Sequence, residues 1–287
     1  MTNSSPEPMQ LPRRTGGRRL PPGRHRSPHR LTLPPDAPAL VLAVPGSASA
    51  PSAQIVAQIA ESAGESCSGA QVRVGYLEGS TQSLAQALLF DEAPRSATAL
   101  QGVVVPLLAG PHPVCDPAIE DIISQAAAPL LLAAQLGPHP LMAEALHARL
   151  AEAGLARESR ARGLSIVAAA NGVLVLADRG EEAVQAAAVS AVLLAGRLAA
   201  PTAAASLGDQ ASIESGLARL RDAGVSKPAF APCVIGPESD PAELTDLAGS
   251  LGALCSKPLG AHPTVAQLVA MRYGAALAGL RLAGSAG

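Results

Sequence analysis

Aromatic residues are scarce in this sequence of 287 residues. It contains no Trp, two Phe and two Tyr, whereas 48% of its residues are hydrophobic, mostly Ala, Leu and Val. A core of small aliphatic side chains lacks the aromatic platforms on which single-stranded nucleic acids stack. The sequence also lacks an uninterrupted apolar run long enough to span a membrane. These absences argue against a nucleic-acid partner and against a membrane protein.

Motifs for nucleotide binding, serine hydrolysis and metal clusters are missing as well. No strand-like run is followed by G-x-G-x-x-G or a Walker-type loop, and no G-x-S-x-G elbow occurs. The cysteines include no C-x-x-C pair, which a zinc ribbon or an iron–sulfur cluster would need. We therefore predict free thiols and a cytoplasmic location. The four cysteines are Cys67, Cys115, Cys233 and Cys255.

The first 37 residues differ in composition from the rest. They carry seven arginines, from Arg13 to Arg30, against only Glu7 and Asp36, and they are rich in Pro and Gly. Such a segment has too little apolar surface to order itself, so residues 1–37 are expected to form a disordered basic tail. An arm that binds nucleic acid or an anionic surface is the alternative. Without this tail the chain has 14 basic and 21 acidic residues, a net charge of −7, which offers no nucleic-acid face.

From residue 38 the chain alternates strand-like apolar runs with amphipathic helical runs. Strands that are apolar on both faces are typical of a parallel sheet covered by helices on each side. The order therefore predicts a doubly wound α/β domain. The four strand-like runs are residues 39–44, 71–77, 102–108 and 129–134.

The same pattern then starts again. Three segments recur in order, at offsets of 126, 126 and 123 residues. We predict two tandem similar domains, each a small parallel sheet flanked by helices, over residues 38–157 and 158–287, with an active site in the cleft between them. The matching pairs are "LVLAVPG" (40–46) with "LSIVAAANG" (164–172), "GVVVPLLAGPHPVCDP" (102–117) with "KPAFAPCVIGPESDP" (227–241), and "LGPHPLMAEAL" (136–146) with "LGAHPTVAQLV" (259–269).

Residues 38–281 resemble the CbiX/SirB-type sirohydrochlorin chelatases in their long, internally duplicated form. The resemblance rests on "VRVGYLEGSTQSLAQAL", "VVVPLLAGPH" and the repeated L-G-x-H-P segment with its helix. It implies the class II chelatase fold and the insertion of Fe²⁺ or Co²⁺ into sirohydrochlorin, for sirohaem or cobalamin. The metal and the tetrapyrrole are then substrates, no prosthetic group is needed, and the duplication lets one monomer form the whole site.

The resemblance also implies a metal site built from loops after three neighbouring strands. The family places a histidine in A-H-G-S after the first strand, an acid after the second and a histidine in G-x-H after the third. Glu78 and His112 match the second and third positions, so both are predicted metal ligands and catalytic residues. Imidazole suits Fe²⁺ and Co²⁺ and titrates near neutrality. The first motif, however, has Pro45 where the histidine belongs, and a proline side chain has no ligand atom.

The tetrapyrrole carries many carboxylates, which need donors. Gly46 and Ser47 are predicted to bind one of them through backbone amides at the next helix N-terminus. A plain strand-to-helix turn is the alternative. Arg73 and Arg95 are further candidates for these carboxylates.

The remaining candidates have mainly structural interpretations. Asp116 is expected to cap the helix that follows it, and Cys115 to pack as a small hydrophobe rather than to act as a soft ligand. His139 and His262 both lie in L-G-x-H-P, which predicts a role at a helix start. His147 is expected on a solvated helix face.

The second copy offers no replacement histidine in this alignment. Asn171 aligns with Pro45, and Glu238 aligns with His112. Two functions therefore stay open: a chelatase with activity reduced by Pro45, and a non-catalytic paralogue that binds tetrapyrrole or metal, or that pairs with an active chelatase.

Overall fold

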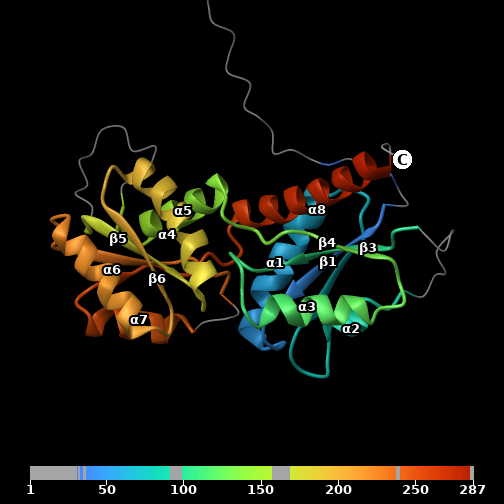
Figure 1. Cartoon of the computed structure of the whole chain (residues 1–287), viewed down its shortest axis with the longest axis horizontal. Helices are drawn as coiled ribbons and strands as arrows, with labels where there is room; N and C mark the ends of the chain where they lie inside the picture. The colour runs from blue at the N-terminus through green and yellow to red at the C-terminus, as the bar shows by residue number, and fades with distance from the viewer. Residues whose placement is uncertain are drawn as a thin grey trace, which may run out of the picture.

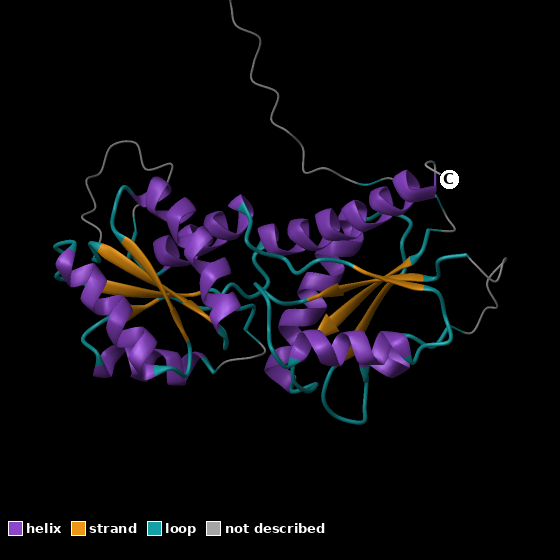
Figure 2. Ribbon diagram, in the orientation of Figure 1, coloured by secondary structure: helices purple, strands orange, loops and turns teal. Residues whose placement is uncertain are grey.

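The structure is a computed structural model that describes residues 31, 33, 34, 37–90, 99–156, 169–236 and 240–284. Two lobes lie next to each other, each built around a four-stranded sheet with helices on both faces (Figures 1 and 2). Most of the predicted basic tail lies outside the described residues. Within it, Leu31 and Leu33 run along the end of the first helix, where their amides donate to the carbonyls of Ser66 and Ser68.

Every strand pairing within the two sheets is parallel, and the strand order is the same in both. This confirms the predicted α/β class with two similar tandem domains. The N-terminal lobe has the order β2-β1-β3-β4, from β1 (Ala39–Val44), β2 (Val72–Tyr76), β3 (Gly102–Pro106) and β4 (Leu130–Leu132). The C-terminal lobe has the order β6-β5-β7-β8, from β5 (Gly172–Ala177), β6 (Thr202–Ser206), β7 (Pro228–Pro232) and β8 (Leu254–Cys255).

Each sheet is covered by four helices. On the N-terminal lobe these are α1 (Ala50–Ser66), α2 (Leu84–Ala87), α3 (Cys115–Ser124) and α8 (Pro263–Gly284). On the C-terminal lobe they are α4 (Pro140–Glu152), α5 (Glu181–Leu198), α6 (Gln210–Asp222) and α7 (Pro241–Ser250). None of the helices in the described part of the chain is long and apolar enough to cross a membrane.

The last helix of each sequence repeat crosses to the other lobe. Helix α4 follows β4 along the chain but packs on α5 and β7, whereas α8 follows β8 but packs on α1 and β3 (Figure 1). The Tyr273 hydroxyl of α8 donates to the Pro38 carbonyl, 2.6 Å away, just before β1. Each lobe is therefore completed by a helix from the other half of the sequence.

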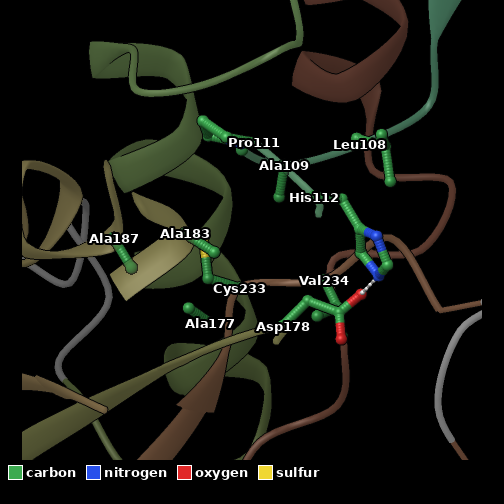
Figure 3. Close-up of a pocket in the computed structure, with 11 residues that line it drawn as sticks. Leu108, Ala109, Pro111, His112, Ala177, Asp178, Ala183, Ala187, Cys233 and Val234 are labelled. Carbon is green, nitrogen blue, oxygen red and sulfur yellow. Dashed lines mark ion pairs between the residues drawn. The ribbon is translucent and has the colours of Figure 1, made fainter. Parts of the chain in front are cut away.

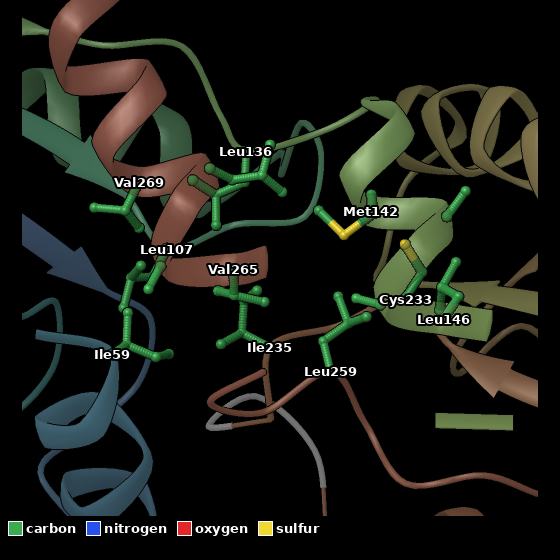
Figure 4. Close-up of a cluster of buried hydrophobic side chains, with 14 of the residues drawn as sticks. Ile59, Leu107, Leu136, Met142, Leu146, Cys233, Ile235, Leu259, Val265 and Val269 are labelled. Carbon is green, nitrogen blue, oxygen red and sulfur yellow. The ribbon is translucent and has the colours of Figure 1, made fainter. Parts of the chain in front are cut away.

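Alternation along the strands divides the core into layers, because successive side chains point to opposite faces. In β1, Leu40, Leu42 and Val44 face α1 and α8, while Val41 faces α2 and α3. The first layer is continuous with its counterpart in the C-terminal lobe, so one hydrophobic cluster spans both lobes. Figure 4 shows its central part, with side chains from α1, α8, α4 and the loops after β7 and β8.

The sequence alignment placed the first strand of the second repeat too early in the chain. The predicted match is residues 164–172, but the strand β5 begins at Gly172. Residues 164–168 lie outside the described part, and 169–171 form no strand. Alanine has low strand propensity, whereas "GVLVLA" is rich in Val and Leu. The strand register shows that Gly172 is the equivalent of Ala39. Gly172 pairs with the first residue of β7, and Ala39 pairs with the first residue of β3.

Candidate functional site at the lobe junction

Three neighbouring strands of the N-terminal lobe end at one edge of the sheet, as predicted. The strand order β2-β1-β3 places the loops that carry Glu78, Pro45 and His112 next to one another. The Glu78 amide donates to the Gly46 carbonyl at 2.9 Å, which ties the first two loops together. The Leu107 amide donates to the Ala43 carbonyl at 2.8 Å and holds the third alongside.

His112 is fixed by the start of helix α3. Its Nδ1 accepts hydrogen bonds from the amides of Val114 and Cys115, at 3.1 and 3.0 Å. Its own amide donates to Asp116 Oδ2 at 2.9 Å. Because Nδ1 faces two N–H donors, its lone pair is used, and the neutral ring must carry its proton on Nε2. The direction in which Nε2 points therefore decides what His112 can do.

His112 Nε2 points at a carboxylate of the other lobe. Asp178 Oδ2 lies 3.3 Å from it, and the two side chains are 12% (His112) and 23% (Asp178) exposed (Figure 3). Asp178 follows β5 directly, and its Oδ1 accepts from the Arg179 amide at 2.8 Å. Ser206 Oγ donates to the Asp178 carbonyl at 3.0 Å and fixes the backbone there. The pair lines one small cavity at the lobe junction, together with Gly110 and other residues.

Asp178 was missed by the sequence interpretation because of the misplaced strand. With Gly172 equivalent to Ala39, the residue equivalent to Pro45 is Asp178, and Asn171 precedes the strand. The Asn171 side chain instead bridges the amides of Ser226 and Lys227. The signal was present in "GVLVLADRG", an apolar run followed at once by an acid and a glycine.

Glu78 is exposed, and its carboxylate has no hydrogen bond or ion pair among the described residues. Pro45 is buried at the end of β1. In the described part of the chain, no three His, Cys, Asp or Glu side chains gather closely enough to hold one metal ion. A metal site made by His112 and Glu78 therefore stays a prediction.

The loop with Gly46 and Ser47 leads from β1 into α1. Gly46 adopts a positive φ of 72°, a turn conformation that glycine allows. The helix begins only at Ala50, with Ser49 as its N-cap accepting from the Ser52 amide at 3.4 Å. Pro51 has no N–H to offer. The amides of Gly46 and Ser47 have no acceptor among the described residues, so carboxylate binding there stays a prediction.

Two L-G-x-H-P histidines have the structural role that was predicted. His139 Nδ1 accepts from the Leu141 amide at 3.1 Å, and His262 Nδ1 accepts from the Thr264 amide at 3.3 Å, each at a helix start. Burial lowers the pKa of His139, and the charge of Arg272 lowers it further. Burial also lowers the pKa of His262, with a further lowering by Arg149 that Glu152 and Glu144 oppose.

Several other expectations are corrected. Asp116 does not cap α3, which begins one residue earlier; its carboxylate braces the loop by accepting from His112 and from Gln135 Nε2. His147 is buried, with only 9% of its surface exposed, so the solvated-face interpretation is wrong. Arg95 and Glu238 lie outside the described residues.

Arg73 is held within the N-terminal lobe rather than offered to a ligand. Its guanidinium donates to the carbonyls of Ala87 and Leu89 and lies 4.5 Å from the centre of the Phe90 ring. All four cysteines are free thiols, as predicted. Burial raises the pKa of Cys67 and of Cys255 to about 11, which keeps these two thiols protonated at neutral pH.

A larger cleft of about 830 Å³ lies between α1 and the C-terminal lobe. Its lining includes Ser49, Gln58, Arg149 and Lys257. The Arg149 guanidinium is already used, because it donates to the Leu259 carbonyl and pairs with Glu152. Lys257 is exposed, and its ammonium group has no partner among the described residues. The cleft is within the size range of small-molecule sites.

The CbiX family model matches residues 39–153, from the start of β1 to the end of α4. The first repeat is thus similar in sequence to the CbiX family over 115 of the 287 residues of the chain. No curated protein gave a significant match in a sequence comparison.

Solved SirB structures have a similar fold over most of the chain. SirB from Bacillus subtilis with Fe³⁺ is 18% identical, with a TM-score of 0.59 over 82% of this chain and 94% of that one. The sirohydrochlorin chelatase SirB from Bacillus subtilis subspecies spizizenii, in complex with cobalt, is 16% identical, with a TM-score of 0.59 over 83% and 94%. Because these matches cover more than four fifths of this chain, the similarity of fold extends beyond the CbiX match into the second repeat.

Proposed function

We propose that this protein is a sirohydrochlorin chelatase-like protein that inserts Fe²⁺ or Co²⁺ into a tetrapyrrole, in sirohaem or cobalamin biosynthesis. The observation that carries the proposal is the position of His112, which follows β3 of a CbiX domain and faces a carboxylate of the other lobe. The similar SirB structures contain Fe³⁺ and cobalt, which agrees with a metal-handling site.

Metal insertion requires a site that holds the ion loosely, replaces part of its water shell and takes up the protons of two pyrrole nitrogens. In this proposal the metal is handled at the lobe junction by His112 and its neighbours, with Glu78 as a solvent-exposed acid at the same sheet edge. The tetrapyrrole occupies the cleft beside α1, where Lys257 is placed to pair with one of its carboxylates. The protein works in the cytoplasm, where free thiols and ferrous iron are maintained.

The test is metallation by the purified full-length protein. It is mixed anaerobically with sirohydrochlorin and Co²⁺ or Fe²⁺, and the absorbance change is compared with a metal-only control. We expect weak activity that His112→Ala abolishes. Pro45→His should raise the rate on the order of 10²-fold, the lower range for one positioned acid–base group. Rates equal to the control in both the wild type and Pro45→His would contradict the proposal.

A second candidate is a non-catalytic protein that binds tetrapyrrole or metal, or that pairs with an active chelatase. Buried Pro45 at the first motif and the lack of a three-residue metal cluster among the described residues favour it. It predicts saturable binding of sirohydrochlorin, seen as a shift of its absorbance bands, with no metallation above the control.

A further inference from the structure

The two lobes place different residues at equivalent strand ends. Pro45 follows β1 and Asp178 follows β5, and the strand registers make these positions equivalent. The first lobe therefore has no ligand atom at this position, whereas the second lobe has a carboxylate there. Asp178 is also the group that His112 contacts across the junction, at 3.3 Å.

The hydrogen bonds leave His112 without a free lone pair. Its Nδ1 accepts from two backbone amides, which leaves the proton of the neutral ring on Nε2, 3.3 Å from Asp178 Oδ2. A metal ion at Nε2 would require the proton to move to Nδ1, where the amides of Val114 and Cys115 already point. The ring would therefore have to leave its place at the start of α3 before it could bind a metal.

Asp178, in contrast, keeps unused acceptor capacity. Its Oδ1 accepts one bond from the Arg179 amide, and its Oδ2 faces His112. Each carboxylate oxygen has about two lone-pair sites, so one on each oxygen is open to a cation. Carboxylates that bind metals are themselves commonly oriented by hydrogen bonds from a second layer of residues.

We infer that Asp178 of the C-terminal lobe is the carboxylate that binds the divalent substrate metal, and that His112 is a positioning residue that orients it. The inference rests on the proposed function for the identity of the metal as substrate. It differs from the expectation for Glu78, whose carboxylate is exposed and has no partner among the described residues.

The test is Co²⁺ binding to the full-length protein without tetrapyrrole, measured by calorimetry and by proton NMR of the paramagnetic complex. Asp178→Asn keeps the shape and removes the charge, and we expect it to weaken Co²⁺ binding ~100-fold. His112→Asn keeps an acceptor for the two amides, and we expect a loss of ~10-fold, as for outer-layer partners of metal ligands. Glu182→Gln removes an exposed carboxylate of α5 and should change nothing. Circular dichroism melts check that each variant is folded.

The outcomes separate the inference from the proposed function. In the wild-type complex the imidazole N–H of His112 should show only the through-space shift of a group beside the metal-bound carboxylate; the much larger contact shift of a coordinated ring, in a signal that His112→Asn removes, would make His112 the ligand and overturn the inference. Wild-type affinity in Asp178→Asn, a loss confined to Glu78→Gln, or no Co²⁺ binding by the wild type would overturn it too. If Asp178→Asn loses Co²⁺ but the wild type fails to metallate sirohydrochlorin, the inference stands and the proposed function fails. If Asp178→Asn metallates sirohydrochlorin at the wild-type rate, the inference fails and the proposed function stands.

Discussion

The two lobes have one topology but differ in what they place at their strand ends. The N-terminal lobe presents a buried proline, an exposed glutamate and a histidine after its first three strands, whereas the C-terminal lobe presents Asp178 after its first. The helices that close the lobes, in contrast, are nearly equivalent. Arg149 of α4 donates to the Leu259 carbonyl, and Arg272 of α8 donates to the Leu136 carbonyl, so each helix is tied to the loop of the other repeat.

The difference shows that the duplication is kept in the contacts of the two crossing helices and lost in the loops after the strands. His139 and His262, Arg149 and Arg272, and the carbonyls they bind all recur at the 123-residue offset. These contacts hold two half-proteins in one hydrophobic cluster. The strand-end loops also meet across the junction, but through unlike residues: one lobe supplies the imidazole of His112 and the other the carboxylate of Asp178.

The largest expected effect comes from breaking the exchange of helices. Leu146 of α4 is 1% exposed in the shared core, and Leu146→Ala should cost ~2–5 kcal/mol in the free energy of unfolding. Because α4 packs on α5 and β7, the loss of protection in hydrogen exchange should be greatest in the C-terminal lobe, although Leu146 belongs to the first repeat.

Val269 is the equivalent residue of α8 and provides the matched control. It is fully buried, and α8 packs on α1 and β3. Val269→Ala should therefore lower protection first in the N-terminal lobe. If both variants weakened the lobe of their own repeat instead, the exchange of helices would be disproved.

A smaller effect is expected from the two crossing arginines. Arg149 donates from Nε and Nη2 to the Leu259 carbonyl, at 3.0 and 2.7 Å, whereas Arg272 donates only from Nη2 to Leu136, at 3.0 Å. The Nε of Arg272 is buried and has no partner among the described residues. Arg149→Met should cost ~1–3 kcal/mol, because the carbonyl of buried Leu259 loses its side-chain donors.

Arg272→Met should cost less, because it also removes an unsatisfied donor. Urea denaturation of the two variants gives the comparison directly. Equal losses would mean that the hydrogen-bond asymmetry between the two crossings has no energetic consequence.

The fold was predictable because hydrophobic periodicity is a local property. Residues 39–44 were predicted as a strand and form β1, and the L-G-x-H-P repeat located the starts of α4 and α8. The destination of those helices was not predictable, because an amphipathic helix specifies that it covers a sheet but not which one. The alanine-rich residues 164–170 led to the wrong alignment. A run of alanines shows neither the alternation of apolar and polar residues that marks a strand nor the 3.6-residue spacing that marks a helix.

The site was predictable only in part, for a related reason. His112 was found from its motif, and its place at the junction follows from β3. Its partner Asp178 is 66 positions away in the other repeat, and only the packing of the lobes brings the two together. The state of the His112 ring depends on the amides of Val114 and Cys115, whose directions are set by where α3 begins.

The smallest expected effect concerns pH and the two histidines at helix starts. Burial lowers the pKa of His139 and of His262 in the folded chain, and a nearby arginine lowers each further. The unfolded chain therefore binds more protons below about pH 6.5, the ordinary value for histidine, so stability is kept above that pH and falls as the pH drops toward the folded pKa values. Urea denaturation at pH 7.5 and 5.5 measures the decrease. His139→Asn and His262→Asn keep a capping acceptor but cannot titrate, so each should remove part of the decrease and both together more of it; an unchanged pH dependence in the double variant would assign it to other groups.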